Sequence, residues 1–255
     1  MILTHCLPWT QWSREDRTTR MRELAELGET HIVLTSKLLE AAAADSAYLI
    51  TFAEEMKSFG LTFTDCHAFW GTWSDPGMPV PEWREVMLLR HRMAFRLCAR
   101  YGITTMAFHT GNTFNSLFGK DLKLEDYYRS LTDSLDILLP EAEKCGVIIA
   151  LENQWTPLNH TGVLLRVMEK YRSPYLGLCY DSGHGNLTEK GMQFYSGFAL
   201  NDSLKDQFGR TLFPLAAFAF ETQAHPDSVN KPDWPDTILR PGHVFKSLTE
   251  YRFNH

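Results

Sequence analysis

The hydrophobic positions of this chain form short apolar runs that alternate with longer segments of helical periodicity. The apolar runs of strand length occupy residues 2–8, 31–35, 61–69, 103–109, 147–152 and 175–181. Between them, apolar positions recur at helical spacing in residues 14–27, 36–59, 82–101, 124–144 and 161–171. Short apolar runs predict strands, and the longer amphipathic segments predict helices. The pattern therefore predicts a strand–helix unit that repeats along the chain.

Glycine residues mark the predicted ends of four helices, at Gly28, Gly60, Gly102 and Gly146. A left-handed residue after a helix is least costly for glycine, so each is expected to end its helix and turn the chain into a strand. Strands that alternate with helices form parallel units with right-handed crossovers, and continuously apolar strands fit a sheet covered on both faces.

We therefore predict an α/β fold, specifically a (β/α)8 TIM barrel in which all 255 residues form a single domain. A doubly wound open sheet is the alternative, although no GxGxxG follows the first strand. The regular alternation ends after His184, and residues 200–255 are atypical. LAAFAF at 215–220 is a candidate seventh strand, and residues 243–253 are a candidate last helix. Because no eighth strand is recognisable, we expect the barrel to be incomplete or irregular at strands 7–8.

Charge and cysteine content narrow the class of protein. The formal net charge is −6, which argues against binding to nucleic acid through its phosphates. The five cysteines form no CxxC pair and their number is odd, which indicates reduced, buried thiols. Neither a signal peptide nor an apolar run of membrane-spanning length is recognisable. We expect a cytoplasmic protein without membrane or nucleic-acid partners, and a homo-oligomer is compatible with this sequence.

Side chains that bind metals or transfer protons occur near the ends of five of the six predicted strands. In chain order they are His5, Asp65 with His67, His109, Glu152, and Asp181 with His184. In a parallel barrel these strand ends meet at one rim, where active sites lie. A single histidine in such a place is more often structural than catalytic, so the number of such residues carries the argument.

Glu152 and Asp181 are the strongest candidates because each directly follows a core strand. Two carboxylates buried side by side repel each other and lose hydration unless a cation or a shared proton compensates. The alternative is that they cap helices or form loop salt bridges. Carboxylate and imidazole ligands suit Mn²⁺, Mg²⁺, Co²⁺ and Zn²⁺. We therefore predict a divalent-metal site built on these two residues, with Mn²⁺ as the first expectation.

Aromatic residues follow several of the same strands. They are Trp9, Phe69, Trp70, Trp73 and Trp155. Aromatic rings at a pocket mouth commonly stack on sugar rings, and ordinary packing at the rim is the equally weighted alternative.

Two segments carry a family resemblance: GVIIALENQW, which contains Glu152, and YLGLCYDSGHGNL, which contains Asp181 and His184. Together they resemble the paired signature of the xylose isomerase-like TIM barrel superfamily. DCHAFWG and AFHTG resemble its third and fourth strand ends, and the resemblance covers residues 1–190. This superfamily groups sugar phosphate isomerases and epimerases, ketose 3-epimerases, inosose dehydratases and AP endonucleases of family 2.

The resemblance implies roles for individual residues. By analogy with ketose 3-epimerases, Glu152 is a metal ligand and an acid/base, Asp181 is a metal ligand, and His184 contacts the substrate. By analogy with the AP endonucleases, His67 and His109 are zinc ligands. For an epimerase we assign Glu152 and His184 to catalysis and His67, His109 and Trp155 to substrate binding.

The sequence departs from this family toward its C-terminus. The family usually has a histidine after strand seven and a second glutamate after strand eight. Here LAAFAFETQAH offers only Glu221 or His225 in place of that histidine, and no strand-eight glutamate is recognisable. His184 or Glu221 is then the candidate for the second acid/base.

The resulting hypothesis is a metal-dependent isomerase or epimerase that acts on a small sugar or polyol-derived ketone. A metal would hold the substrate oxygens and stabilise an enediolate, and Glu152 would take the proton next to the carbonyl. A keto-inositol dehydratase begins with the same proton abstraction and is the nearest alternative. An AP-endonuclease-like metal phosphodiesterase and a catalytically degenerate barrel are the others, and the acidic pI of 5.9 counts against the nuclease.

Overall fold

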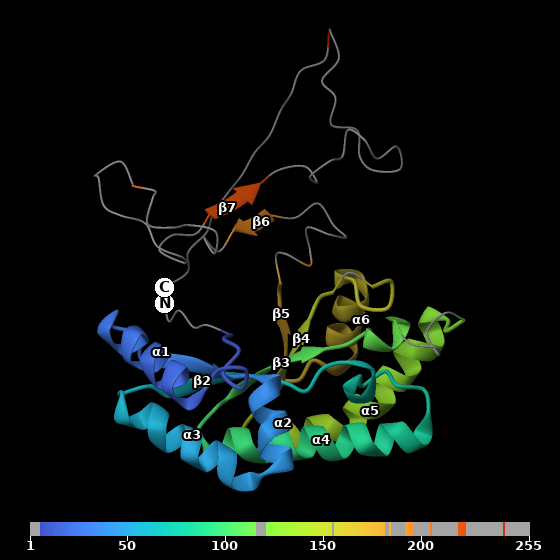
Figure 1. Cartoon of the computed structure of the whole chain (residues 1–255). Coiled ribbons are helices and arrows are strands. Elements are labelled where there is room, and N and C mark those ends of the chain that lie inside the picture. Colours follow the sequence, from blue (N-terminus) through green and yellow to red (C-terminus); the bar gives the residue numbers. More distant parts are fainter. Residues whose placement is uncertain are drawn as a thin grey trace. The chain divides into compact units, whose positions relative to one another are not determined.

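The computed structural model describes residues 6–115, 121–154, 156–181, 184, 192–195, 205, 219–222 and 242. The chain divides into two compact units, Met1–Tyr180 and Asp181–His255, and each is considered by itself. The first unit holds a five-stranded parallel sheet in which the strands lie side by side in chain order (Figure 1). Its strands are β1 (His31–Leu34), β2 (Thr62–His67), β3 (Thr105–His109), β4 (Ile148–Glu152) and β5 (Leu176–Cys179).

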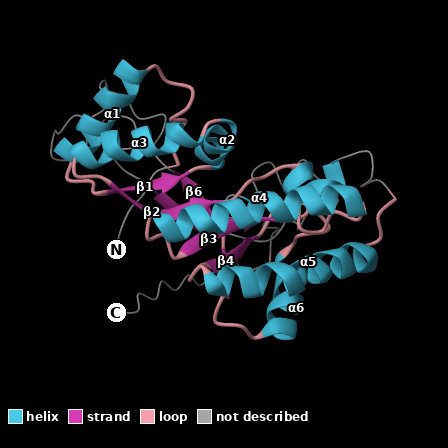
Figure 2. Cartoon of the chain, turned by 90° about the horizontal axis from the view of Figure 1, so that it is seen from below, coloured by secondary structure: helices cyan, strands magenta, loops and turns pink. Residues whose placement is uncertain are grey.

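Helices connect these strands and pack on the sheet, as Figure 2 shows for α4 and α5. The helices are α1 (Arg14–Glu26), α2 (Ser36–Ala44), α3 (Ser46–Ser58), α4 (Pro81–Arg100), α5 (Leu124–Lys144) and α6 (Thr161–Tyr171). Two short 3-10 helices, η1 (Thr72–Ser74) and η2 (Asn112–Asn115), follow β2 and β3. The predicted alternation of strands and helices is thus confirmed from β1 to β5. Within the described residues, these five strands do not close into a barrel.

One predicted helix is wrong in detail: residues 36–59 form two helices, which meet at Asp45. The backbone of Asp45 is extended, with φ −145° and ψ 109°. Its carboxylate accepts a hydrogen bond from the Ala47 amide at 2.9 Å and caps α3. Aspartate competes in this way with the helical hydrogen bonds, so it favours a cap over a helix interior.

The predicted glycine ends are confirmed. Gly60 and Gly146, for example, follow α3 and α5 with φ of 74° and 67°. This left-handed conformation suits glycine and turns the chain toward β2 and β4.

The core of the first unit lies between the sheet and its helices. Along β3, Met106 and Phe108 are buried, whereas Thr105, Ala107 and His109 are partly exposed. The fully buried Ile149 and Leu151 of β4 pair with Met106 and Phe108. Successive strand residues point to opposite faces, so the helix-covered face is apolar and the opposite face carries His109 and Glu152.

An irregularity in β2 determines which of its side chains point to the sheet face that carries His109 and Glu152. The pairing with β1 shifts between Ile32↔Phe63 and Leu34↔Cys66, so β2 has one residue more than β1 in this interval. Phe63 and Cys66 are therefore both buried although they are three positions apart. Such a bulge reverses the alternation of side chains and places His67 on the face that carries His109.

In the second unit, β6 (Met192–Tyr195) and β7 (Ala219–Thr222) form an antiparallel pair. Of the candidate seventh strand at 215–220, residues 215–218 lie outside the described residues. Its last two residues belong to β7, which pairs antiparallel with β6 and not parallel, with Met192 opposite Thr222. The sequences MQFY and AFET mix apolar and polar residues, which fits an antiparallel pair better than a buried parallel strand. Of the predicted first strand, residues 6–8 are not in a strand and residues 2–5 lie outside the described residues. The predicted last helix also lies outside them.

The cysteines were expected to be reduced and buried, and the structure agrees with this only in part. Cys66 and Cys98 are buried free thiols, whereas Cys6 is exposed because it lies in the irregular segment before α1. No helix in the described part of the chain combines the length and apolar character that crossing a bilayer requires.

Candidate functional site

Three strand ends of the first unit bring ligand-type atoms together. His109 and Glu152 are register partners across β3 and β4, and His67 ends the neighbouring strand β2. Nε2 of His109 lies 3.2 Å from Oε1 of Glu152 and 3.2 Å from Nε2 of His67. The three residues each offer one ligand atom, and these atoms lie within 4.8 Å of one another. These three residues could together hold a metal ion.

His67 is held in the form that a metal ligand needs. Its Nδ1 donates a hydrogen bond to the carbonyl of Ala68 at 2.9 Å, which leaves the lone pair of Nε2 facing His109. Burial, and secondarily the nearby His109, lower the pKa of His67, so the neutral imidazole is favoured. Histidine ligands of metals usually donate their second nitrogen to a carbonyl in this way.

Glu152 is buried beside these rings. Only 6% of the residue is exposed, and the side chain of His109 is also largely covered. A buried carboxylate is costly unless it is paired, protonated or bound to a cation. Two imidazoles and one carboxylate form a ligand set found at catalytic zinc sites, and the same donors accept other divalent metals. The residues present therefore fit a divalent cation.

The aromatic residues divide between the core and the site. Trp9 and Phe69 are fully buried and belong to the core, so the packing alternative applies to these two residues. Trp9 packs edge-on against Trp12. Trp73 is half-exposed but packs against Trp83 with ring centroids 3.9 Å apart.

Of these described aromatic residues, only Trp70 has a ring contact with the cluster of His67, His109 and Glu152. Its ring lies edge-on to His109 at 6.2 Å, and 51% of the residue is exposed. This leaves ring surface available beside the cluster.

Other predicted site residues lie outside the first unit or outside the described residues. Asp181 and His184 belong to the second unit, where the His184 amide donates to Oδ1 of Asp181 at 2.6 Å. The expected meeting of Asp181 with Glu152 stays a prediction. Trp155, His5 and His225 lie outside the described residues, and Glu221 is described only as part of β7.

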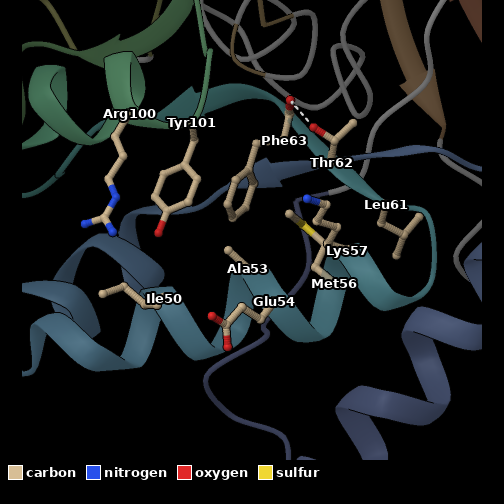
Figure 3. Close-up of a pocket in the computed structure, with 10 residues that line it drawn as sticks. All are labelled: Ile50, Ala53, Glu54, Met56, Lys57, Leu61, Thr62, Phe63, Arg100 and Tyr101. Carbon is tan, nitrogen blue, oxygen red and sulfur yellow. Dashed lines mark hydrogen bonds between the residues drawn. The ribbon is translucent and has the colours of Figure 1, made fainter.

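A cavity of about 370 Å³ is separate from this cluster. It lies between α3, the start of β2 and the end of α4, with Phe63, Tyr101 and Met56 in its wall (Figure 3). Thr62, at the amino end of β2, lines it, whereas His67 stands at the carboxyl end. Since active sites of parallel barrels lie at the carboxyl ends, this cavity is not the candidate site.

Three buried polar residues next to the site were missed by sequence reasoning. Asp75, Tyr127 and Asn159 are each fully buried and hydrogen-bonded. They lie in loops or in α5 and not at a strand end, so no local pattern distinguishes them from ordinary polar residues.

Two curated sugar-converting enzymes share a short stretch of sequence with this chain. The galactose mutarotase of Rattus norvegicus is 39% identical over 67 residues, which is 26% of this chain and 20% of that protein. The chain thus matches about a fifth of the length of this curated relative. The aldose 1-epimerase of Escherichia coli (strain K12) is 42% identical over 71 residues, or 26% of this chain and 19% of that protein.

Solved structures share the fold at low sequence identity. The 3-keto-D-glucoside 4-epimerase YcjR of E. coli has a TM-score of 0.58 and 18% identity, and the match covers 74% of this chain and 71% of that one. The D-psicose 3-epimerase of Clostridium cellulolyticum H10 has a TM-score of 0.57 and 13% identity, with 69% and 61% covered. The IolI protein, solved with a bound zinc atom, has a TM-score of 0.54, 18% identity, and 69% and 61% covered.

The family comparison agrees with the fold and with the strand-end signatures. A family model described as xylose isomerase-like TIM barrel matches residues 20–222, which is most of the chain. The parallel order of β1 to β5, with helices between the strands, is the arrangement that this fold requires. The chain therefore belongs to the xylose isomerase-like TIM barrel family.

Proposed function

We propose that this chain is a metal-dependent isomerase or epimerase of a small sugar or polyol-derived ketone. The observation that carries the proposal is the convergence of His67, His109 and Glu152 at the carboxyl ends of three adjacent strands. Similarity of fold to D-psicose 3-epimerase and 3-keto-D-glucoside 4-epimerase supports a sugar substrate. The local similarity to galactose mutarotase also supports this substrate class.

His67, His109 and Glu152 are the residues proposed to hold the cation. Mn²⁺ is the first expectation, and the two imidazoles also suit Zn²⁺, which the IolI structure contains. Asp181 is proposed as a further ligand, because it follows β5 by two residues and Cys179 of β5 is the register partner of Glu152. When bound, the cation would supply a Lewis acid for the substrate's carbonyl and hydroxyl oxygens.

Glu152 is proposed to move the proton. Its Oε1 faces His109, and we assign to its second carboxylate oxygen the removal of a proton from the carbon next to the substrate carbonyl. His184 is proposed to return the proton. Trp70 would cover the apolar face of the sugar with its exposed ring, and Trp155 stays a proposal for substrate contact.

The proposal is tested on the full chain by metal analysis and a sugar panel in D₂O. We expect one bound divalent cation and, with the true substrate, isomerisation accompanied by solvent deuterium at the reacting carbon. Absence of metal uptake from both Mn²⁺ and Zn²⁺ solutions would contradict the metal site and favour the degenerate barrel. Three zinc ions per chain would favour the phosphodiesterase, and loss of water from a keto-inositol would favour the dehydratase.

A second candidate function is exchange of sugar anomers, favoured by the local identity of 39% to galactose mutarotase. Anomer exchange opens and closes the sugar ring without breaking a bond from carbon to hydrogen. Polarimetry of fresh α-D-galactose would detect it, and it would leave no deuterium on carbon. This difference separates the two candidate functions in one set of reactions.

A further inference from the structure

The loop after β4 is unusually rich in buried polar residues. Asn153, Gln154, Thr156 and Asn159 are all 2% exposed or less. Burying polar groups is unfavourable unless their hydrogen bonds are made, so a loop of this kind is normally tied to a specific partner. The bonds of Asn159 identify that partner.

The side chain of Asn159 spans the ends of β3 and β4. Its Nδ2 donates to the carbonyl of Thr110 at 2.7 Å and to the carbonyl of Glu152 at 3.0 Å. Its Oδ1 accepts a hydrogen bond from the backbone amide of Gln154 at 3.0 Å. Both amide hydrogens are thereby used. The last register pair of these strands is His109↔Glu152, so Asn159 extends the connection between the strands just beyond that pair.

Close packing accompanies these bonds. Gly111 has φ of 78°, and a Cβ there would lie 2.5 Å from Oγ1 of Thr156 and 2.7 Å from Cβ of Asn159. Only glycine therefore allows the loop after β3 to approach the loop after β4 so closely.

A second set of bonds ties the loop after β2 to the same place. The hydroxyl of Tyr127 accepts from the amide of Gly111 and donates to Oδ1 of Asp75 at 2.7 Å. Oδ2 of Asp75 accepts from the amide of Thr113 at 2.7 Å. Hydrogen bonds therefore link the three loops that follow His67, His109 and Glu152.

We propose that Asn159 is a positioning residue, which holds the backbone at Glu152 and next to His109 so that their side chains meet at the cluster with His67. This inference rests on the proposed function for the identity of the site. Its central observation is that the side-chain amide of Asn159 donates both of its hydrogens, one to the end of β3 and one to the end of β4. Replacement of Asn159 by aspartate keeps the size of the side chain and places carboxylate oxygen against two carbonyls, which breaks both bonds.

The experiment compares wild-type protein with Asn159→Asp, Asn159→Ala and Tyr171→Phe. The Tyr171 hydroxyl lies 2.7 Å from both the Thr132 carbonyl oxygen and Oδ1 of Asp136, and its single hydrogen serves one of these two acceptors. Tyr171→Phe therefore removes a hydrogen bond between α6 and α5, away from His67, His109 and Glu152, and is the matched control. The Zn²⁺ dissociation constant, Tm and the histidine ring resonances of the metal-free protein are measured for each. Should Asn159→Asp fail to fold, Asn159→Ser takes its place.

We expect the Asn159 variants to bind Zn²⁺ about 10- to 100-fold more weakly, because losses of this size are usual when a residue that orients a metal ligand is replaced. Tyr171→Phe should lower Tm but leave the dissociation constant unchanged. Folded Asn159 variants with wild-type Zn²⁺ affinity and unmoved His109 resonances would overturn the inference. If wild-type protein binds neither Zn²⁺ nor Mn²⁺, the proposed function fails, and the His109 resonances alone then decide whether Asn159 positions this residue.

Discussion

His109 and Glu152 face each other across the last register pair of β3 and β4, with Nε2 and Oε1 3.2 Å apart. Neighbouring strands hold these positions, so the two side chains meet without any loop having to close over them. His67 joins them from β2 and places a second imidazole nitrogen 3.2 Å from the first. The candidate site is thus built mainly on regular structure, which favours a defined ligand geometry.

Replacement of Glu152 by glutamine tests its role in proton transfer. The amide keeps the shape of the side chain but is neither a base nor an anionic ligand, so we expect turnover of the identified sugar to fall by about 100- to 10,000-fold. Circular dichroism and Tm should show that the fold persists. Near-normal turnover by the purified variant would rule out this role.

Removal of either imidazole tests the metal site. We expect His67→Ala and His109→Ala each to weaken Zn²⁺ or Mn²⁺ binding strongly, measured by calorimetric titration, since each removes one of three converging donors. His31→Ala is the matched control, because His31 lies at the opposite end of its strand, at the start of β1. Equal affinities in all three variants would show that the metal binds elsewhere.

His91 should make stability depend on pH. It is fully buried with Nε2 donating to the Ser74 carbonyl at 2.8 Å, and burial lowers its pKa from 6.5 to about 4. In this pH range the unfolded chain binds the proton more readily than the folded one, so stability falls as the pH drops from about 6.5 to about 4. The contribution lost is about 3 kcal/mol.

Urea unfolding of wild type and His91→Phe at pH 7 and at pH 4.5 measures this contribution. Phenylalanine suits the apolar neighbours of His91, whose ring lies 4.2 Å from that of Phe108. The variant should lose less stability between the two pH values than the wild type does. Parallel losses in both proteins would assign the acid sensitivity to other groups.

The buried pair of Arg17 and Glu55 should matter for stability. Their side chains are only 9% and 8% exposed, and Nη2 lies 2.5 Å from Oε2. Arg17→Met leaves the Glu55 carboxylate buried without its cation, which should cost about 3–5 kcal/mol by denaturant unfolding. Arg166→Ala removes the exposed ion pair with Glu125 and should have a much smaller effect. Similar losses in both variants would contradict this distinction.

Gly77 should not tolerate a side chain. A Cβ there would lie 2.0 Å from the ring of Tyr127, which is fully buried and bonded to Asp75. We expect Gly77→Ala to destabilise the fold by about 1–3 kcal/mol in urea unfolding. Gly177→Ala is the control, because its nearest contact would be an ordinary 3.6 Å to Ile148. A stable Gly77→Ala variant would mean that Tyr127 moves readily.

The sequence alone determined the order of elements from β1 to β5 and the strand ends that carry His67, His109 and Glu152. These features depend on local causes: the period of apolar residues, a glycine after a helix, and the position of a polar residue after an apolar run. The break at Asp45 also has a local cause, but aspartate is tolerated within helices often enough that its capping role was not evident.

Tertiary structure decided which of these residues meet. The bulge in β2 turns His67 toward His109, and its position follows from pairing with β1 and not from the residues of β2 alone. Asn159 reaches Thr110 only because β3 and β4 are neighbours, although the two residues are 49 positions apart. Contacts between distant segments depend on register and packing, which no local sequence pattern specifies.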